Sequence, residues 1–141
     1  MTQWNDSRTR LRPSLNRAGV VQAAVDSYGS LDVLVNNTAV FGAGANAVDI
    51  PEDVWDMTMR VNLKGPFLCS QAATGRMREQ EGGGSIVFVC SVSGVLANEH
   101  QADYNASKYG VIGLARCIAS IVAMGGSGPT PFARLACRAP R

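Results

Sequence analysis

The sequence predicts an α/β fold in which short parallel strands alternate with amphipathic helices. Two short apolar runs carry this prediction, residues 31–35 (LDVLV) and residues 85–90 (SIVFVC). Strands that are buried on both faces of a parallel sheet have this composition. Longer segments with helical spacing precede, separate and follow the two runs. A helix–strand–helix–strand–helix order is typical of an open sheet with parallel strands.

Turn and cap residues set the bounds of the first helix and the first strand. Residues 20–28 (VVQAAVDSY) have the spacing of the end of an amphipathic helix, and Gly29 is a suitable stop. The strand at residues 31–35 ends at an Asn-Asn pair. The following residues 41–48 are rich in Gly and Ala and predict a loop.

A second helix is predicted from residue 52 to about residue 78. It begins at Pro51-Glu52-Asp53, with Pro in the first turn and acidic side chains near the positive end of the helix dipole. Gly65-Pro66 predicts a break or kink inside it. The turn at residues 82–84 (GGG) then leads into the second strand.

The last helix is predicted over residues 103–122, where apolar residues recur at helical spacing. Beyond it the sequence is rich in Gly, Pro and Arg and predicts irregular structure. We therefore divide the chain into a basic irregular segment (residues 1–19), a folded core (residues 20–122) and a basic irregular tail (residues 123–141).

The composition is that of a single soluble, cytoplasmic domain. The chain has 141 residues, of which 46% are hydrophobic, so it is long enough and apolar enough to bury one core. No apolar run approaches the roughly 20 residues that cross a bilayer. The N-terminal residues lack the apolar stretch of a secretory signal. One histidine and four cysteines without a CxxC pair predict no metal site and reduced thiols.

The net charge of +2 is unevenly distributed. Residues 20–115 contain five basic and ten acidic side chains, whereas the first 19 residues carry a charge of +3 and the last 26 carry +4. Basic tails can contact phosphate groups. Because no aromatic residues are interleaved with these arginines, we expect no nucleic-acid partner and keep a nucleic-acid binder only as an outside alternative.

Tyr104 and Lys108 lie four residues apart in the last predicted helix and therefore share one of its faces. A phenol with an ordinary pKa near 10 is a poor proton shuttle at neutral pH. A neighbouring ammonium group favours the phenolate, which suits Tyr104 for proton exchange with an alcohol or a ketone. Taken alone, the pair also fits a solvated lysine beside an interface tyrosine.

Ser91 follows the second apolar run and lies thirteen residues before Tyr104. Ligands of open α/β sheets bind at the carboxyl ends of the strands. The Ser91 hydroxyl would therefore hydrogen-bond a substrate oxygen and stabilise negative charge that develops there. Ser93 is a second candidate donor. Taken alone, Ser91 also fits an ordinary turn at the end of a strand.

Three motifs, in this order and spacing, resemble the short-chain dehydrogenase/reductases. Residues 32–39 (DVLVNNTA) are similar to the Asn-Asn-Ala-Gly strand end of that family, and residues 61–65 (VNLKG) to the segment with its fourth catalytic residue. The Ser-x-Ser-Gly turn at Ser91 and the sequence YNASK at residues 104–108 are similar to its active-site segment. The resemblance spans about residues 20–120, and 3-oxoacyl-carrier-protein reductases and sugar or steroid dehydrogenases are the most similar types.

The resemblance implies a Rossmann-like parallel sheet with flanking helices and an NAD(P)-dependent oxidoreductase. Such an enzyme transfers a hydride between NAD or NADP and a small carbonyl or secondary alcohol substrate. By resemblance, Tyr104 is the acid/base, Ser91 orients the substrate carbonyl, and Lys108 binds the nicotinamide ribose and tunes Tyr104. Asn62 would hold a water that links Lys108 to solvent. Asn36 would support the sheet and the adenosine side of the cofactor.

The chain also departs from the family pattern. Ala39 stands where the family has Gly. Family members begin with a strand and a glycine-rich turn whose helix receives the pyrophosphate, and residues 1–30 contain no such turn. We therefore expect a partial sheet that lacks the N-terminal nucleotide-binding strands and the C-terminal strands, with an exposed edge at residues 31–35.

These departures leave two interpretations of function. The first is an active oxidoreductase, although cofactor binding is weakened where the glycine-rich turn is missing. The second is a catalytically inactive, truncated remnant that at most associates with intact relatives. The resemblance also implies homo- or hetero-oligomers through the helices that carry Asn62 and Tyr104.

Overall fold

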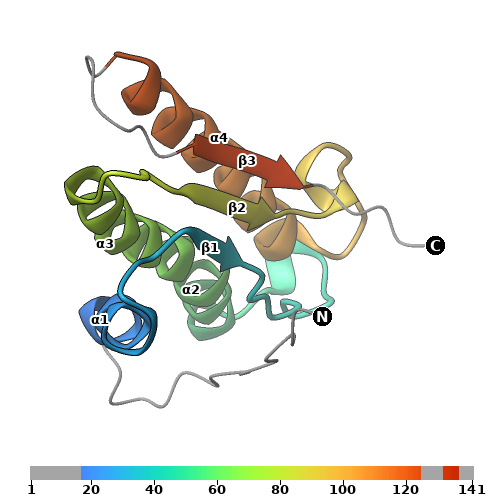
Figure 1. Cartoon of the computed structure of the whole chain (residues 1–141). Coiled ribbons are helices and arrows are strands. Elements are labelled where there is room, and N and C mark those ends of the chain that lie inside the picture. The colour runs from blue at the N-terminus through green and yellow to red at the C-terminus, as the bar shows by residue number, and fades with distance from the viewer. Residues whose placement is uncertain (1–16, 125–131, 137–141) are drawn as a thin grey trace, which may run out of the picture.

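A computed structural model describes residues 17–124 and 132–136 of the chain (Figure 1). Helices and strands follow one another as α1 (Arg17–Tyr28), β1 (Val33–Asn36), α2 (Glu52–Met59), α3 (Gly65–Glu79), β2 (Ser85–Val89), α4 (Ala102–Met124) and β3 (Phe132–Ala136). A π-helical turn, Arg60–Lys64, joins α2 to α3. Short 3-10 turns lie at Ala47–Asp49 and Val92–Gly94. No helix in the described ranges combines the length and apolar content that crossing a membrane requires.

The three strands form one parallel sheet in the order β1-β2-β3. Val35 pairs with Val87, and Val87 pairs in turn with Arg134. The predicted α/β fold with parallel strands is therefore confirmed. Each connection between neighbouring strands passes through a helix, as parallel pairing requires.

The strand β3 corrects two expectations, that residues 123–141 are irregular and that the sheet has no strand after the last helix. Helix α4 extends to Met124, and Phe132–Ala136 pairs with β2 along its whole length. The physical reason is that β2 would otherwise leave its backbone N–H and C=O groups unpaired on that edge. Residues 17–19, expected to be irregular, belong to α1. The remainder of the two predicted tails, residues 1–16, 125–131 and 137–141, lies outside the described residues.

Local signals set the ends of the helices where the sequence predicted them. Gly29 has φ +80°, and its N–H donates to the Val25 carbonyl at 2.8 Å, which ends α1. The irregularity expected at Gly65-Pro66 is the π-helical turn that precedes it. Pro66 has no N–H for the usual bond four residues back. The N–H of Gly65 instead bonds the Arg60 carbonyl, five residues back.

The core lies between the sheet and the helices α1, α3 and α4. Its buried members alternate along β2, where Ile86 and Phe88 are fully buried. The three helices contribute Val21, Ala73, Met77, Val111 and Ala115, and Leu31 joins the cluster from the segment before β1. The described helices therefore all pack on one face of the sheet, and α4 crosses it behind β2 and β3 (Figure 1).

The opposite face of the sheet is uncovered within the described part of the chain. Val33 and Val35 of β1 point to this face and are 56% and 55% exposed. An all-parallel sheet normally has helices on both faces, which explains why the sequence of β1 is apolar throughout. The predicted exposed edge is also present, because β1 has no neighbour beyond it in the described sheet.

The exposed valines of β1 should bind hydrophobic dyes. The double variant Val33→Thr/Val35→Thr keeps the β-branched shape that favours strands, so its free energy of unfolding should change by less than about 1 kcal/mol. Its anilinonaphthalene sulfonate fluorescence should fall well below that of the wild type. Val48→Thr is the control, because Val48 is 91% exposed but stands alone. Equal dye binding by the wild type and the double variant would contradict an open apolar face.

Candidate functional site

Ser91, Tyr104 and Lys108 line one pocket at the carboxyl end of β2. The pocket has a volume of about 690 Å³, and Asn37 and Phe41 from the loop after β1 complete its wall. Ser91 lies two residues beyond the last residue of β2, and Tyr104 and Lys108 lie in the first two turns of α4. The structure therefore brings together three of the residues that the sequence selected.

Tyr104 and Lys108 are both buried, with 6% and 3% of their surfaces exposed. The Lys108 ammonium lies 5.6 Å from the centre of the Tyr104 ring. It also donates to the Val89 carbonyl at 3.3 Å, a bond that holds the side chain against the end of β2. The two side chains therefore lie next to each other at the carboxyl end of β2.

Burial lowers the pKa of Lys108 below the usual value for lysine, because removal from water penalises the charged form. The neighbouring Cys90 acts in the opposite direction, since a thiolate there stabilises the ammonium group. The net direction is downward. A lysine in this state is poised to exchange a proton more readily than an exposed one.

The Ser91 side chain lies at the start of the 3-10 turn Val92–Gly94 and accepts a hydrogen bond from the Ser93 N–H at 3.2 Å. This bond fixes the position of the Ser91 oxygen and leaves its own proton to donate. Ser93 is only 3% exposed, and its oxygen accepts from Asn98 at 2.7 Å. Both serines line the pocket, but Ser91 is the more exposed of the two and is therefore the better placed candidate donor.

Asn62 is fully buried in the π-helical turn and connects three segments of the chain. Its oxygen accepts from the Val40 N–H at 2.8 Å, and its amide nitrogen donates to the Val40 carbonyl at 2.9 Å. The same nitrogen donates to the hydroxyl of Ser107 at 3.1 Å. Ser107 lies between Tyr104 and Lys108 in the sequence. Asn62 thus ties the loop after β1 to the helix that carries Tyr104.

Asn36 lies apart from the other four selected residues. Its side chain donates to the Ser70 hydroxyl on α3 at 3.0 Å, on the same face of β1 as Leu34. The next residue, Asn37, lines the pocket instead. Because side chains alternate between the faces of a strand, one residue in sequence decides which asparagine reaches the pocket.

Sequence reasoning did not select Phe41 or Asp103, which both contact the Tyr104 segment. The Phe41 ring stacks on the Tyr104 ring with centroids 4.9 Å apart. The Asp103 carboxylate is fully buried and accepts a hydrogen bond from the Tyr104 N–H at 2.8 Å. The Gly- and Ala-rich stretch around Phe41 predicts only a loop, whereas the acidic side chain next to Tyr104 is a signal that the sequence contains.

The donor set of the pocket fits the nicotinamide riboside end of a dinucleotide. The buried Lys108 ammonium uses one of its three protons on Val89, so two remain for ribose hydroxyls. Ser91 and Tyr104 add hydroxyl groups in the same pocket. A glycine-rich turn at a helix N-terminus, which would receive the pyrophosphate, is not found among the described residues.

The sequence and the fold match known proteins. The family described as short chain dehydrogenase matches residues 11–126. A (2S)-[(R)-hydroxy(phenyl)methyl]succinyl-CoA dehydrogenase subunit of Thauera aromatica is 40% identical over 112 residues, 79% of this chain and 43% of the relative. A 3-oxoacyl-[acyl-carrier-protein] reductase of Thermotoga maritima is 44% identical over 97 residues, 69% of this chain and 39% of the relative.

Solved structures give the same match. A short chain dehydrogenase from Mycobacterium smegmatis has a TM-score of 0.80 at 30% identity, and the match covers 87% of this chain and 49% of that protein. An NAD+-bound xylitol dehydrogenase has a TM-score of 0.80 at 28% identity, over 87% of this chain and 45% of its own. The chain spans less than half the length of the curated relatives named above.

The lowered pKa of Lys108 should make stability depend on pH. Folded Lys108 releases its proton more readily than unfolded Lys108, so the unfolded chain binds more protons between the two pKa values and stability rises with pH there. Relative to Lys108→Met, the free energy of unfolding should therefore rise from neutral pH towards about pH 10.4. Urea unfolding at a series of pH values measures this difference.

A Cys90→Ala background in both proteins removes the opposing effect of the thiolate on Lys108. Parallel pH profiles for the lysine and methionine proteins would mean that burial does not perturb Lys108.

Proposed function

Because the chain belongs to the short-chain dehydrogenase family, we propose that it is an NAD(P)-dependent oxidoreductase that interconverts a carbonyl group and a secondary alcohol. The observation that carries this proposal is the convergence of Ser91, Tyr104 and Lys108 on one pocket at the end of β2. The activities named for the relatives, on acyl thioesters and on xylitol, all act on a carbonyl or an alcohol carbon.

Tyr104 transfers the proton in this mechanism. In reduction, its hydroxyl donates a proton to the carbonyl oxygen while a hydride adds to the carbonyl carbon, and the product is the alcohol. A bound nicotinamide cofactor supplies that hydride or takes it up in the reverse direction. The Ser91 hydroxyl donates a hydrogen bond to the same oxygen and stabilises its developing charge. The Lys108 ammonium stabilises the phenolate that remains on Tyr104.

Reprotonation of Tyr104 requires a path to solvent, and we assign Asn62 to it. The Asn62 oxygen accepts a hydrogen bond from the Val40 N–H, and the Asn62 nitrogen donates to the Val40 carbonyl and to the Ser107 hydroxyl. One lone pair of the Asn62 oxygen is left for a water. Such a water would receive a proton from solvent and pass it towards Lys108.

The cofactor is NAD or NADP in this proposal, and Asn36 supports its adenosine side through the sheet. The bond from Asn36 to Ser70 makes this support indirect, because the side chain reaches α3 and not the pocket. Lys108 would hold the ribose hydroxyls, and Tyr104 would lie against the nicotinamide end.

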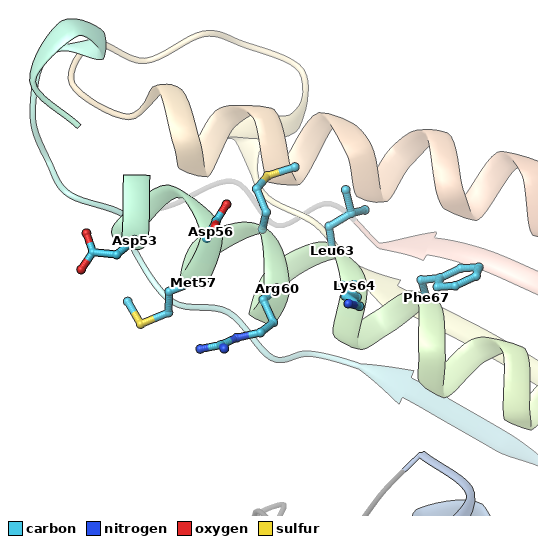
Figure 2. Close-up of a pocket in the computed structure, with 8 residues that line it drawn as sticks. Asp53, Asp56, Met57, Arg60, Leu63, Lys64 and Phe67 are labelled. Carbon is cyan, nitrogen blue, oxygen red and sulfur yellow. The ribbon is translucent and has the colours of Figure 1, made fainter. Parts of the chain in front are cut away.

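The second candidate function is that of an inactive remnant that associates with other chains of the family. The observation in its favour is a surface on the helices that a second chain could cover. A hollow of about 730 Å³ lies along α2, the π-helical turn and the start of α3, and Figure 2 shows the side chains that line it.

The charges in this hollow suit pairing with a second, antiparallel copy. Asp53 and Asp56 lie at one end, and Arg60 and Lys64 follow along the same helical segment (Figure 2). A two-fold axis would place the acidic end of one copy against the basic end of the other. Phe67, which is 44% exposed, supplies an apolar contact beside them.

Cofactor binding distinguishes the two candidates. We expect the purified chain to bind NADH or NADPH saturably, measured by nicotinamide fluorescence. Lys108→Ala should weaken binding about tenfold or more, because a hydrogen bond from a charged group is lost. Tyr104→Phe should leave binding within about threefold and lower the turnover of simple ketones at least about 100-fold.

Arg116→Ala is the matched control for the lysine variant, because Arg116 is an exposed basic residue on the same helix. It should bind like the wild type. Folded protein without saturable binding of either nucleotide would overturn the oxidoreductase proposal for this chain and leave the remnant.

Association through the helices has its own test. Light scattering after gel filtration should give a dimer or larger assembly for the wild type and a monomer for Phe67→Glu, because the new carboxylate is desolvated at the contact. Val48→Glu, at a 91% exposed position outside the hollow, should keep the wild-type mass. A wild-type monomer at about 100 µM, well above a micromolar dissociation constant, would exclude this surface as a stable interface.

A further inference from the structure

The segment of residues 40–43 crosses the start of α4, and each of its residues contacts a side chain of the site or of the helices beside it. Its first residue, Val40, exchanges two hydrogen bonds with the Asn62 side chain. Its last residue, Ala43, donates its N–H to the Asp103 carboxylate at 3.1 Å. The two residues between these anchors contact Tyr104 and Asp103. This loop is therefore anchored to the two helical segments that carry the candidate catalytic residues.

Asp103 is the anchor on the side of α4. Its carboxylate is fully buried and accepts three hydrogen bonds, from Ala43, from the Thr58 hydroxyl at 3.3 Å and from the Tyr104 N–H at 2.8 Å. Asp103 also lies in the first turn of α4, where the helix dipole favours a negative charge. A buried carboxylate with three hydrogen-bond donors holds those donors in a fixed arrangement.

Gly42 lets the loop backbone approach this carboxylate. A Cβ atom at position 42 would lie 1.8 Å from one Asp103 oxygen and 2.1 Å from the carboxyl carbon. Because the Asp103 side chain is buried and hydrogen-bonded, it has little room to move aside. Any larger residue at position 42 would push the loop away from α4.

Phe41 lies between these anchors, and its ring covers the Tyr104 ring. The two ring planes differ by 22°, and their centroids are 4.9 Å apart. Phe41 itself is 75% exposed, whereas Tyr104 is 6% exposed. The exposed Phe41 ring on the anchored loop therefore shields Tyr104, whose phenol the proposed mechanism requires.

We propose that Asp103 is a positioning residue that, together with Gly42, holds Phe41 over Tyr104 as one wall of the active-site pocket. The role of this wall rests on the proposed function, but the placement of Phe41 does not. With Phe41 in place, water reaches the Tyr104–Lys108 pair less easily. The attraction between the ammonium group and the phenolate is stronger where water is excluded.

The test measures the accessibility of Tyr104 without cofactor or substrate. Tetranitromethane nitrates exposed tyrosines, and peptide mass spectrometry gives a rate for each one. Tyr28 and Tyr109, which are 69% and 47% exposed, serve as internal standards. In the wild type, Tyr104 should react more slowly than both.

Phe41→Leu and Asp103→Ala should each raise the Tyr104 rate at least about fivefold, the population change expected when an aromatic pair is lost. The rates of Tyr28 and Tyr109 should not change. Phe41→Tyr retains a ring and should restore the slow Tyr104 rate. Gly42→Ala should behave like Asp103→Ala. Its control is Gly113→Ala on α4, where an added Cβ meets nothing within 4 Å.

An unchanged Tyr104 rate in Phe41→Leu would overturn the proposal, because Phe41 is too exposed for its removal to unfold the chain. An unchanged rate in folded Asp103→Ala would overturn the positioning role of Asp103. If Asp103→Ala unfolds, all three tyrosines will react faster together. The comparison of Gly42→Ala with Gly113→Ala then tests whether the loop must approach Asp103 to shield Tyr104. Failure of nucleotide binding would leave these rates unaffected and so would count only against the oxidoreductase proposal.

Discussion

The buried amide of Asn62 is the contact on which the arrangement of the site depends. It satisfies both backbone groups of Val40 and also bonds Ser107, so one side chain joins the loop after β1, the π-helical turn and α4. Buried polar groups are costly unless they are paired. The three segments therefore have little freedom to separate, and the pocket between them keeps its shape. The π-helical turn matters because it orients Asn62 inward at the point where Pro66 interrupts the regular hydrogen bonding.

The sheet imposes the second constraint. Its helices cover one face in the described part of the chain, and the core of Ile86, Phe88 and the surrounding helix residues lies there. The other face carries the half-exposed valines of β1. An apolar sequence of this kind is typical of a parallel strand that is buried on both faces. The structural features that position Ser91, Tyr104 and Lys108 all lie on the covered side or at the strand ends, so the uncovered face takes no part in the candidate site.

The proposed proton transfer and the proposed binding of a dinucleotide depend on different structural features. The side chains proposed for proton transfer lie at the end of β2 and on α4, next to the loop at residues 40–43. Pyrophosphate binding normally depends on backbone N–H groups at a helix N-terminus after a glycine-rich turn. The pocket at the end of β2 and a pyrophosphate site of that kind are therefore built from different segments.

The sequence by itself determined the features that depend on local periodicity and spacing. The strands at residues 31–35 and 85–90 and the helix with Tyr104 and Lys108 on one face were all predictable, because i and i+4 are neighbours on any helix. The tertiary structure decided which distant segments meet. Phe132–Ala136 became a strand because β2 had an open edge, and Asn36 turned to Ser70 because side chains alternate along β1. Phe41 and Asp103 acquired their contacts with Tyr104 only through the crossing of a loop over α4, which no local pattern encodes.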